Sequence, residues 1–209
     1  MKTAWILLGG RLTDTPCLRQ TLHDHPADLV LAADGGIHHS ALLGVTADIW
    51  LGDFDSSSQA DLPDTLTQQF PTEKDELDGE LAISAARDRG CNNLLLLGAL
   101  GGRTDHMLAL LLIALKMTKQ GCSVILHGGD EWALPVVAGA YVVPTYAGQT
   151  LSLLALDSME TVCLDGVHWP LCGASLPAGV GLGMSNIALG QEVSLSVGCG
   201  SGFLIFQCT

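Results

Sequence analysis

The most informative segment of the chain is Asn93-Leu94-Leu95-Leu96-Leu97-Gly98-Ala99-Leu100-Gly101-Gly102-Arg103-Thr104-Asp105-His106. Its apolar first half has the length of a buried strand, and the glycines that follow permit a sharp turn. From Thr104 to Gln120 the sequence continues with a helical pattern. Because a buried strand that turns through glycines into a helix is typical of a parallel sheet covered by helices, this segment predicts an α/β domain.

The first 128 residues repeat this alternation of short apolar runs and helix-length segments. We expect the clearest helices at Leu77–Arg89 and Thr104–Gln120, since a glycine that suits a left-handed C-cap follows each of them. The strands predicted for a parallel sheet are Ala4–Leu8, Leu29–Ala32, Asp48–Leu51, Asn93–Leu97 and Ser123–His127.

After residue 128 the helical period disappears, and β-rich runs follow at hairpin spacing. All nine Lys and Arg residues lie in the first 119 positions, so residues 120–209 contain none. The sequence therefore predicts an N-terminal parallel-sheet α/β domain at residues 1–128 and a small all-β sandwich domain at residues 129–209. The strands expected in the second domain are Val136–Val143, Thr150–Leu156, Thr161–Leu164, Glu192–Val197 and Phe203–Gln207.

The composition excludes several classes of partner. A formal net charge of -13 argues against a sequence-independent grip on nucleic acid or on an anionic membrane. The longest apolar run, Met107–Leu115, is far below the roughly 18 residues that a membrane span needs. A short apolar stretch near the start ends at Gly9 before it reaches the length of a signal peptide. We therefore expect a cytoplasmic protein that binds neither nucleic acid nor membrane.

Polar residues follow two of the predicted strands, where an open parallel sheet binds its ligands. Ala33-Asp34-Gly35-Gly36 combines glycines that allow close backbone approach with a carboxylate that can accept a hydrogen bond or a proton. A simple helix cap would also explain it. In Gly52-Asp53-Phe54-Asp55-Ser56 the two carboxylates point to the same side of an extended chain, where Mg²⁺ would offset their repulsion. An exposed acidic turn is the alternative.

Two further segments combine charge with glycine or a helix start. Glu73–Glu80 contains five acidic residues and Lys74. Asp75 and Asp78 have the spacing of a capping box, but Lys74 also suits an anionic ligand and Asp78 a metal ion. Gly101-Gly102-Arg103 exposes backbone N–H groups before a helix and adds a guanidinium, which favours phosphate, although a structural turn is possible. It is not a Walker A loop.

Two loops of the predicted β domain also suit a ligand. Gly166–Leu171 and Gly181–Asn186 carry aromatic and small polar residues and no basic ones. Such loops can take a flat, weakly charged or cationic organic group, and ordinary sandwich turns remain the alternative.

Taken in this order, the segments resemble the thiamine pyrophosphokinase family. The resemblance implies an N-terminal domain that binds ATP and a C-terminal β-sandwich that binds thiamine and forms a homodimer. It also implies transfer of the pyrophosphoryl group of Mg-ATP to the hydroxyethyl group of thiamine, which gives thiamine diphosphate and AMP. The motifs that carry it are Ala33-Asp34-Gly35-Gly36, Gly52-Asp53-Phe54-Asp55-Ser56, Glu73-Lys74-Asp75 with Asp78, Gly101-Gly102-Arg103-Thr104-Asp105-His106, Trp169-Pro170-Leu171 and Ser185-Asn186.

The same resemblance implies roles for individual residues. Mg²⁺ would be held by Asp53, Asp55 and Asp78. Either Asp34 or Asp105 would orient or deprotonate the attacking hydroxyl. The residues implied for the ATP side are Lys74, Asp75, Gly101, Gly102, Arg103 and Thr104. Those implied for thiamine are Ser185 and Asn186, with Trp169 or Phe203 stacking on the aminopyrimidine ring.

Two other functions remain open at this point. Leu77, His168 and Ile187 stand where the family usually has threonine, lysine and glutamate. These differences leave open a pyrophosphokinase of the same fold that acts on another alcohol, such as a hydroxymethyl pterin. A non-catalytic module that binds nucleotide or thiamine diphosphate is the other alternative, against which the intact acidic residues and Arg103 argue.

Overall fold

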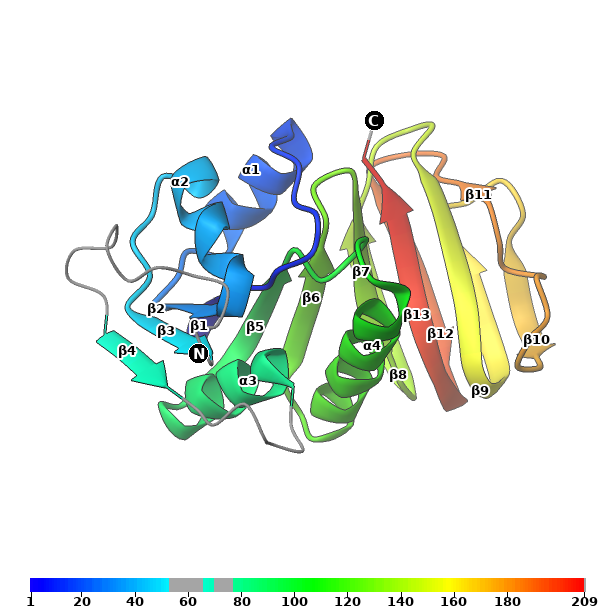
Figure 1. The fold of residues 1–209 in the computed structure, drawn as a ribbon. Helices are drawn as coiled ribbons and strands as arrows, with labels where there is room; N and C mark the ends of the chain where they lie inside the picture. Colours follow the sequence, from blue (N-terminus) through cyan, green and yellow to red (C-terminus); the bar gives the residue numbers. More distant parts are fainter. Residues whose placement is uncertain (53–65, 70–76, 209) are drawn as a thin grey trace. The chain divides into compact units, whose positions relative to one another are not determined.

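The computed structural model describes residues 1–52, 66–69 and 77–208 (Figure 1). The chain divides into two compact units, Met1–Asp130 and Glu131–Thr209. This division falls after residue 130, compared with the predicted boundary after residue 128. Among the described helices, none has both the length and the apolar character needed to cross a bilayer.

The first unit contains a parallel sheet in the order β4-β3-β2-β1-β5-β6. The five predicted strands are confirmed with ends that differ by at most two residues, whereas β4 was not predicted. The strands are β1 (Lys2–Leu7), β2 (Leu29–Ala33), β3 (Ile49–Gly52), β4 (Leu66–Gln69), β5 (Cys91–Leu97) and β6 (Ser123–His127).

Helices cover this sheet, which explains why its strands are apolar without alternation. Residues 94–97 of β5 are all buried, as expected for a strand with both faces covered. Helix α3 packs against β1, β2, β3 and β5, and α4 packs against β6. The helices are α1 (Pro16–Asp24), the 3₁₀ helix η1 (Asp34–His38), α2 (His39–Leu43), α3 (Asp78–Asp88) and α4 (Thr104–Lys119).

The strand order reverses at β1, because β2, β3 and β4 lie on one side of it and β5 and β6 on the other. Such a switch point leaves a crevice at the carboxyl ends of the two central strands, here β1 and β5. The loops after these strands touch through their backbones. A Cβ atom on Gly10 would lie 2.3 Å from the carbonyl oxygen of Gly98, so no side chain fits there.

The second unit is antiparallel, and its longest strand belongs to two groups of strands (Figure 1). The first half of β9 pairs with β13 and β11, and its second half pairs with β10 and β12. The strands are β7 (Glu131–Val136), β8 (Gly139–Pro144), β9 (Thr150–Asp165), β10 (Leu171–Leu176), β11 (Asn186–Ile187), β12 (Glu192–Val197) and β13 (Cys199–Gln207).

Two sequence predictions in this unit were wrong. The run Val136–Val143 is not one strand, because β7 ends at Val136 and β8 begins at Gly139. The Tyr141 hydroxyl closes the turn between them, since it accepts from the Val137 N–H at 2.8 Å and donates to the Val137 carbonyl at 3.1 Å. The two strands predicted at 150–156 and 161–164 form the single strand β9, in which Thr161 has a φ of 54°.

The core of the second unit is built from the inward-facing apolar residues of these strands. Trp132 of β7 and Phe206 of β13 stack with their ring centroids 4.3 Å apart and their planes 13° from parallel. Phe206 is fully buried in a close-packed core, so a smaller side chain at this position would leave its space empty.

The variant Phe206→Ala should lower the free energy of unfolding by about 3–5 kcal/mol, because it leaves a cavity and removes the stacked ring. The matched control is Leu156→Ala in β9, where the side chain is exposed and the loss should stay below about 1 kcal/mol. Urea unfolding followed by tryptophan fluorescence measures both values. Equal losses in the two variants would show that this core is not packed as described.

Candidate functional site

A cavity of about 330 Å³ lies at the switch point of the parallel sheet. Its walls come from the ends of β1, β2 and β5 and the residues after them, namely 8–10, 33–35, 98, 99 and 101, together with the start of α3 and the first two turns of α4. The volume is that of a small-molecule site. The cavity brings together Asp34, Asp78, Gly101 and Arg103, which the sequence analysis selected from four separate segments.

Asp34 stands in a strained and partly buried position in this cavity. Its φ is 44°, in the left-handed region that residues other than glycine rarely adopt. The Trp50 side chain donates from Nε1 to the Asp34 carbonyl at 2.9 Å and so fixes the backbone. Within the described part of the chain, the buried carboxyl oxygen Oδ1 has no hydrogen-bond partner. Because an unsatisfied buried oxygen costs about 1–3 kcal/mol, this geometry favours a bound ligand.

Asp78 reaches the same cavity as the first residue of α3. Leu77 occupies the N-cap position and makes no side-chain cap. The predicted capping box, with Asp78 at the third helical position, is therefore wrong. Gly79 lets the helix start pack closely, because a Cβ atom there would lie 3.0 Å from side-chain carbons of Leu8 and of Leu110. The cavity thus has two carboxylates among its described lining residues that offer hard oxygen ligands, those of Asp34 and Asp78.

The turn before α4 prepares a site for an anion. Gly101 and Gly102 have φ values of 82° and 87°, which glycine adopts without strain. Arg103 is the N-cap residue and its side chain makes no cap hydrogen bond, whereas Asp105 Oδ1 accepts from the His106 N–H at 3.0 Å in the first turn, which begins with Thr104. A 16-residue helix presents its first N–H groups and the positive end of its dipole at this point.

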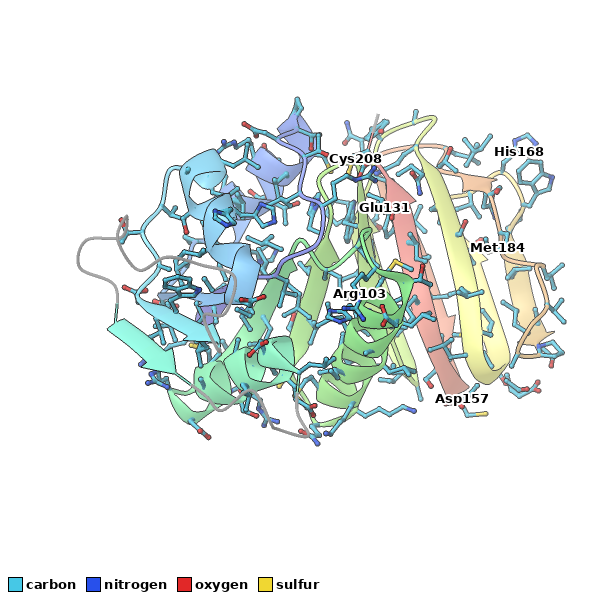
Figure 2. The ribbon with its side chains drawn as sticks, viewed as in Figure 1. Arg103, Glu131, Asp157, His168, Met184 and Cys208 are labelled. Atoms are coloured by element: carbon cyan, nitrogen blue, oxygen red, sulfur yellow. The ribbon has the colours of Figure 1, made fainter. Side chains whose placement is uncertain are left out.

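Arg103 forms an exposed bidentate ion pair with Asp105 at the start of α4 (Figure 2 labels Arg103). Its Nη2 lies 2.6 Å from Asp105 Oδ2, and its Nε lies 3.2 Å from Oδ1. The hydrogen bond from Arg103 lowers the pKa of the Asp105 carboxyl from 3.8 to about 2. A carboxylate with so low a pKa is a poor proton acceptor at neutral pH.

Two segments at this edge of the sheet were missed by the sequence analysis. Gly9 and Gly10 line the cavity directly after β1, and His39 Nε2 donates to the Gly10 carbonyl at 2.9 Å. Arg11 pairs with Asp130 at 2.8 Å, and its side chain lies against Gly101. The sequence did carry a signal for the first segment. Gly9 and Gly10 follow the apolar run that became β1, as Gly35-Gly36 come after the run of β2 and Gly101-Gly102 after that of β5.

The candidate thiamine residues all lie in the second unit, where Asn186 has a structural role. Its buried side chain accepts from the Trp169 N–H at 3.1 Å and donates to the Trp169 carbonyl at 2.7 Å. The Trp169 ring is 56% exposed, whereas Phe203 is 1% exposed and has no free face for stacking. Ser185, with a φ of 54°, donates its N–H to Ser152 Oγ at 3.0 Å. Asn186 thus positions the backbone of Trp169.

Four residues selected from the sequence lie outside the described residues: Asp53, Asp55, Lys74 and Asp75.

The Arg103–Asp105 pair can be tested by titration. In the wild type the Asp105 carboxyl should titrate with a pKa of about 2, and in Arg103→Gln its pKa should rise toward 3.8. Since the folded pKa is lowered, any stability from this pair is present above pH 3.8 and is lost as the pH falls toward 2. Carbon-detected NMR of the carboxyl group measures both pKa values. An unchanged value in the variant would refute the assigned cause.

Comparison with known proteins identifies the family to which the chain belongs. The family model described as "Thiamin pyrophosphokinase, catalytic domain" matches residues 21–126, just over half of the chain. A search of curated proteins found no match.

Solved structures with the same fold cover nearly the whole chain. Thiamine pyrophosphokinase from Bacillus subtilis is 22% identical over 99% of both chains, with a TM-score of 0.85. The enzyme from Geobacillus thermodenitrificans is 24% identical over 99% of this chain and 98% of its own, with a TM-score of 0.83. That from Candida albicans is 13% identical over 99% and 90%, with a TM-score of 0.79. Together with the family model, these matches show that the chain is an enzyme of the thiamin pyrophosphokinase family, a thiamine diphosphokinase.

Proposed function

We propose that this enzyme transfers the pyrophosphoryl group of Mg-ATP to the hydroxyethyl oxygen of thiamine, giving thiamine diphosphate and AMP. The observation that carries the proposal is the cavity at the switch point, which is lined by Asp34, Asp78 and Arg103. The buried Oδ1 of Asp34 has no hydrogen-bond partner among the described residues. This set of groups suits a polyphosphate and its cation. Membership of the family supplies the two substrates.

The phosphates of ATP would bind at the start of α4. Arg103 offers a guanidinium with two parallel donors, and Gly101, Gly102 and Thr104 offer the backbone of the turn and of the first helical residue. The Arg103 side chain is 70% exposed in its pair with Asp105. Because exposed ion pairs contribute little stability, Arg103 can exchange Asp105 for phosphate at a small cost in free energy. Lys74 and Asp75 complete the proposed set.

The residues of the cavity fit Mg²⁺. Asp34 and Asp78 provide carboxylate oxygens in one cavity, and Asp34 Oδ1 is buried without a partner in the described part of the chain. We assign Asp53, Asp55 and Asp78 as the ligands. When bound, Mg²⁺ neutralises part of the phosphate charge while AMP departs.

The acceptor hydroxyl needs a group that orients it or takes its proton. Asp34 lines the cavity with a fixed backbone, whereas Asp105 is not among the described residues that line the cavity and is 64% exposed. We therefore assign this role to Asp34.

Thiamine would bind in the second unit, which we propose as the thiamine-binding and dimerisation domain. Trp169 offers an exposed ring for the aminopyrimidine. The His168 ring packs edge-on against it with the two ring centroids 4.5 Å apart, and the Asn186 side chain donates a hydrogen bond to the Trp169 carbonyl. We keep Ser185 as the direct polar contact. Residues 131–209 contain no Lys or Arg, so no basic side chain of this unit repels the positive thiazolium ring.

A homodimer in the cytoplasm completes the proposal. The segment that contains β11 exposes a group of apolar side chains, which is unusual for a free surface. These residues are Val180, Leu182, Met184, Ile187 and Leu189. The unit also lacks the lysines that commonly protect sheet edges from pairing with another chain.

One assay separates the proposed reaction from its rivals. AMP release from Mg-ATP by the purified enzyme should require thiamine and should match the thiamine diphosphate formed. If AMP appears only with another alcohol, such as a hydroxymethyl pterin, the acceptor assignment is wrong. If no AMP appears with either acceptor while nucleotide still binds, the chain is a binding module.

The two candidate proton acceptors can be separated by matched substitutions. Asp34→Asn should lower kcat by on the order of a hundredfold, about 3 kcal/mol of transition-state stabilisation, because it removes a carboxylate inside the cavity. Asp105→Asn should lower kcat less than about tenfold. Steady-state kinetics at saturating substrates measure both, and circular dichroism checks that each variant is folded. The reverse ranking of the two variants would assign the role to Asp105.

A further inference from the structure

Strand β10 contains an irregularity that places two cysteines on facing positions. Leu171 pairs with Leu164, and Ala174 pairs with Val162, so Cys172 and Gly173 together face the single residue Cys163. This two-against-one arrangement is a β-bulge. Gly173 adopts a φ of 64°, which only glycine takes without strain.

The two cysteine side chains lie close enough across the strands to interact. The Gly173 N–H donates to Cys163 Sγ at 3.1 Å, which fixes that sulfur beside the bulge. The pKa of the Cys172 thiol is raised, first by the charge of the Cys163 thiolate and then by a hydrogen bond between the two side chains. Cys172 is exposed and Cys163 is half-buried, and both are free cysteines. The pair therefore combines an accessible thiol with a neighbouring one.

We propose that Cys163 and Cys172 form a modification site, at which a low-molecular-weight disulfide converts them into an intramolecular disulfide. The exposed Cys172 thiol first loses its proton to solvent, and its sulfur then attacks the small disulfide and displaces one small thiolate, leaving a mixed disulfide on Cys172. The Cys163 thiolate then attacks the Cys172 sulfur and displaces the second. The two protein thiols lose two electrons and two protons, and the small disulfide becomes two thiols.

The new bond would act on the loop between β9 and β10. It closes the segment from Cys163 to Cys172, which includes His168 and Trp169 (Figure 2 shows His168). Without this bond, the backbone of Trp169 is restrained by its two hydrogen bonds to the side chain of Asn186, which lies outside the segment. A covalent link across the base of the loop restricts its opening from the other end. Oxidation should therefore slow the opening of this loop without any new contact to Trp169.

Peptide mapping of the full-length protein tests the proposal directly. The enzyme is incubated with oxidised glutathione, free thiols are blocked, and peptides are analysed by mass spectrometry with and without dithiothreitol. We expect a linked peptide that joins Cys163 to Cys172 and disappears on reduction. The variant Cys172→Ser should abolish it, whereas Cys199→Ser, which removes another exposed free cysteine of the same unit, should leave it unchanged. A stable glutathione adduct on Cys172 without the linked peptide would overturn the proposal.

Hydrogen exchange tests the effect on the loop. Backbone amides of residues 166–169 should exchange at least about threefold more slowly in the oxidised protein than in the reduced one, and dithiothreitol should restore the faster rate. Neither readout needs substrate, so both remain interpretable if the enzyme acts on another alcohol. Equal exchange rates in the two forms would show that the bond does not restrain the loop.

Discussion

The candidate site depends on the backbone contact between the loops that follow β1 and β5. A Cβ atom on Gly10 would lie 2.3 Å from the Gly98 carbonyl oxygen, and one on Gly98 would lie 2.5 Å from that of Leu8. His39 adds a hydrogen bond that holds the Gly10 carbonyl. Because the two loops touch without side chains between them, the floor of the cavity is made of backbone, and the charged groups stand around it at fixed positions.

The acidic and basic groups around this floor are held in different ways. Asp34 has a fixed, strained backbone and a buried carboxyl oxygen without a partner in the part of the chain that the structure describes. Arg103 and Asp105 are exposed and satisfy each other. A buried oxygen of this kind gains from a ligand that donates a hydrogen bond to it, whereas an exposed pair exchanges partners at little cost. The site thus combines one rigid ligand position with one adaptable anion contact.

The second unit shows how a residue expected to touch a substrate also holds its neighbours. The Asn186 amide bonds to the Trp169 backbone and accepts from the Ile187 N–H, so it fixes the backbone that carries the exposed ring. Phe203, the other aromatic candidate, is buried in β13. These contacts and this burial come from the packing of the unit, which a motif does not contain.

The sequence alone determined the elements whose signals are local. The apolar runs that became β1, β2, β3, β5, β6 and β12, and the glycines after α3 and α4, could be recognised because each depends on neighbouring residues. The motifs around Asp34, Asp78 and Arg103 were also found in this way. The chain's place in the thiamin pyrophosphokinase family followed from their order.

Only the tertiary structure decided how these pieces meet. The two strands predicted at 150–156 and 161–164 form the single strand β9, and the strand predicted at 136–143 is divided by a turn that Tyr141 closes. Strand ends depend on partners that are distant in sequence. The tertiary structure also brought Gly9 and Gly10 into the cavity and tied Asp105 to Arg103. Strand order, burial and ion pairing arise between residues far apart in the chain or from side-chain geometry, so no local pattern contains them.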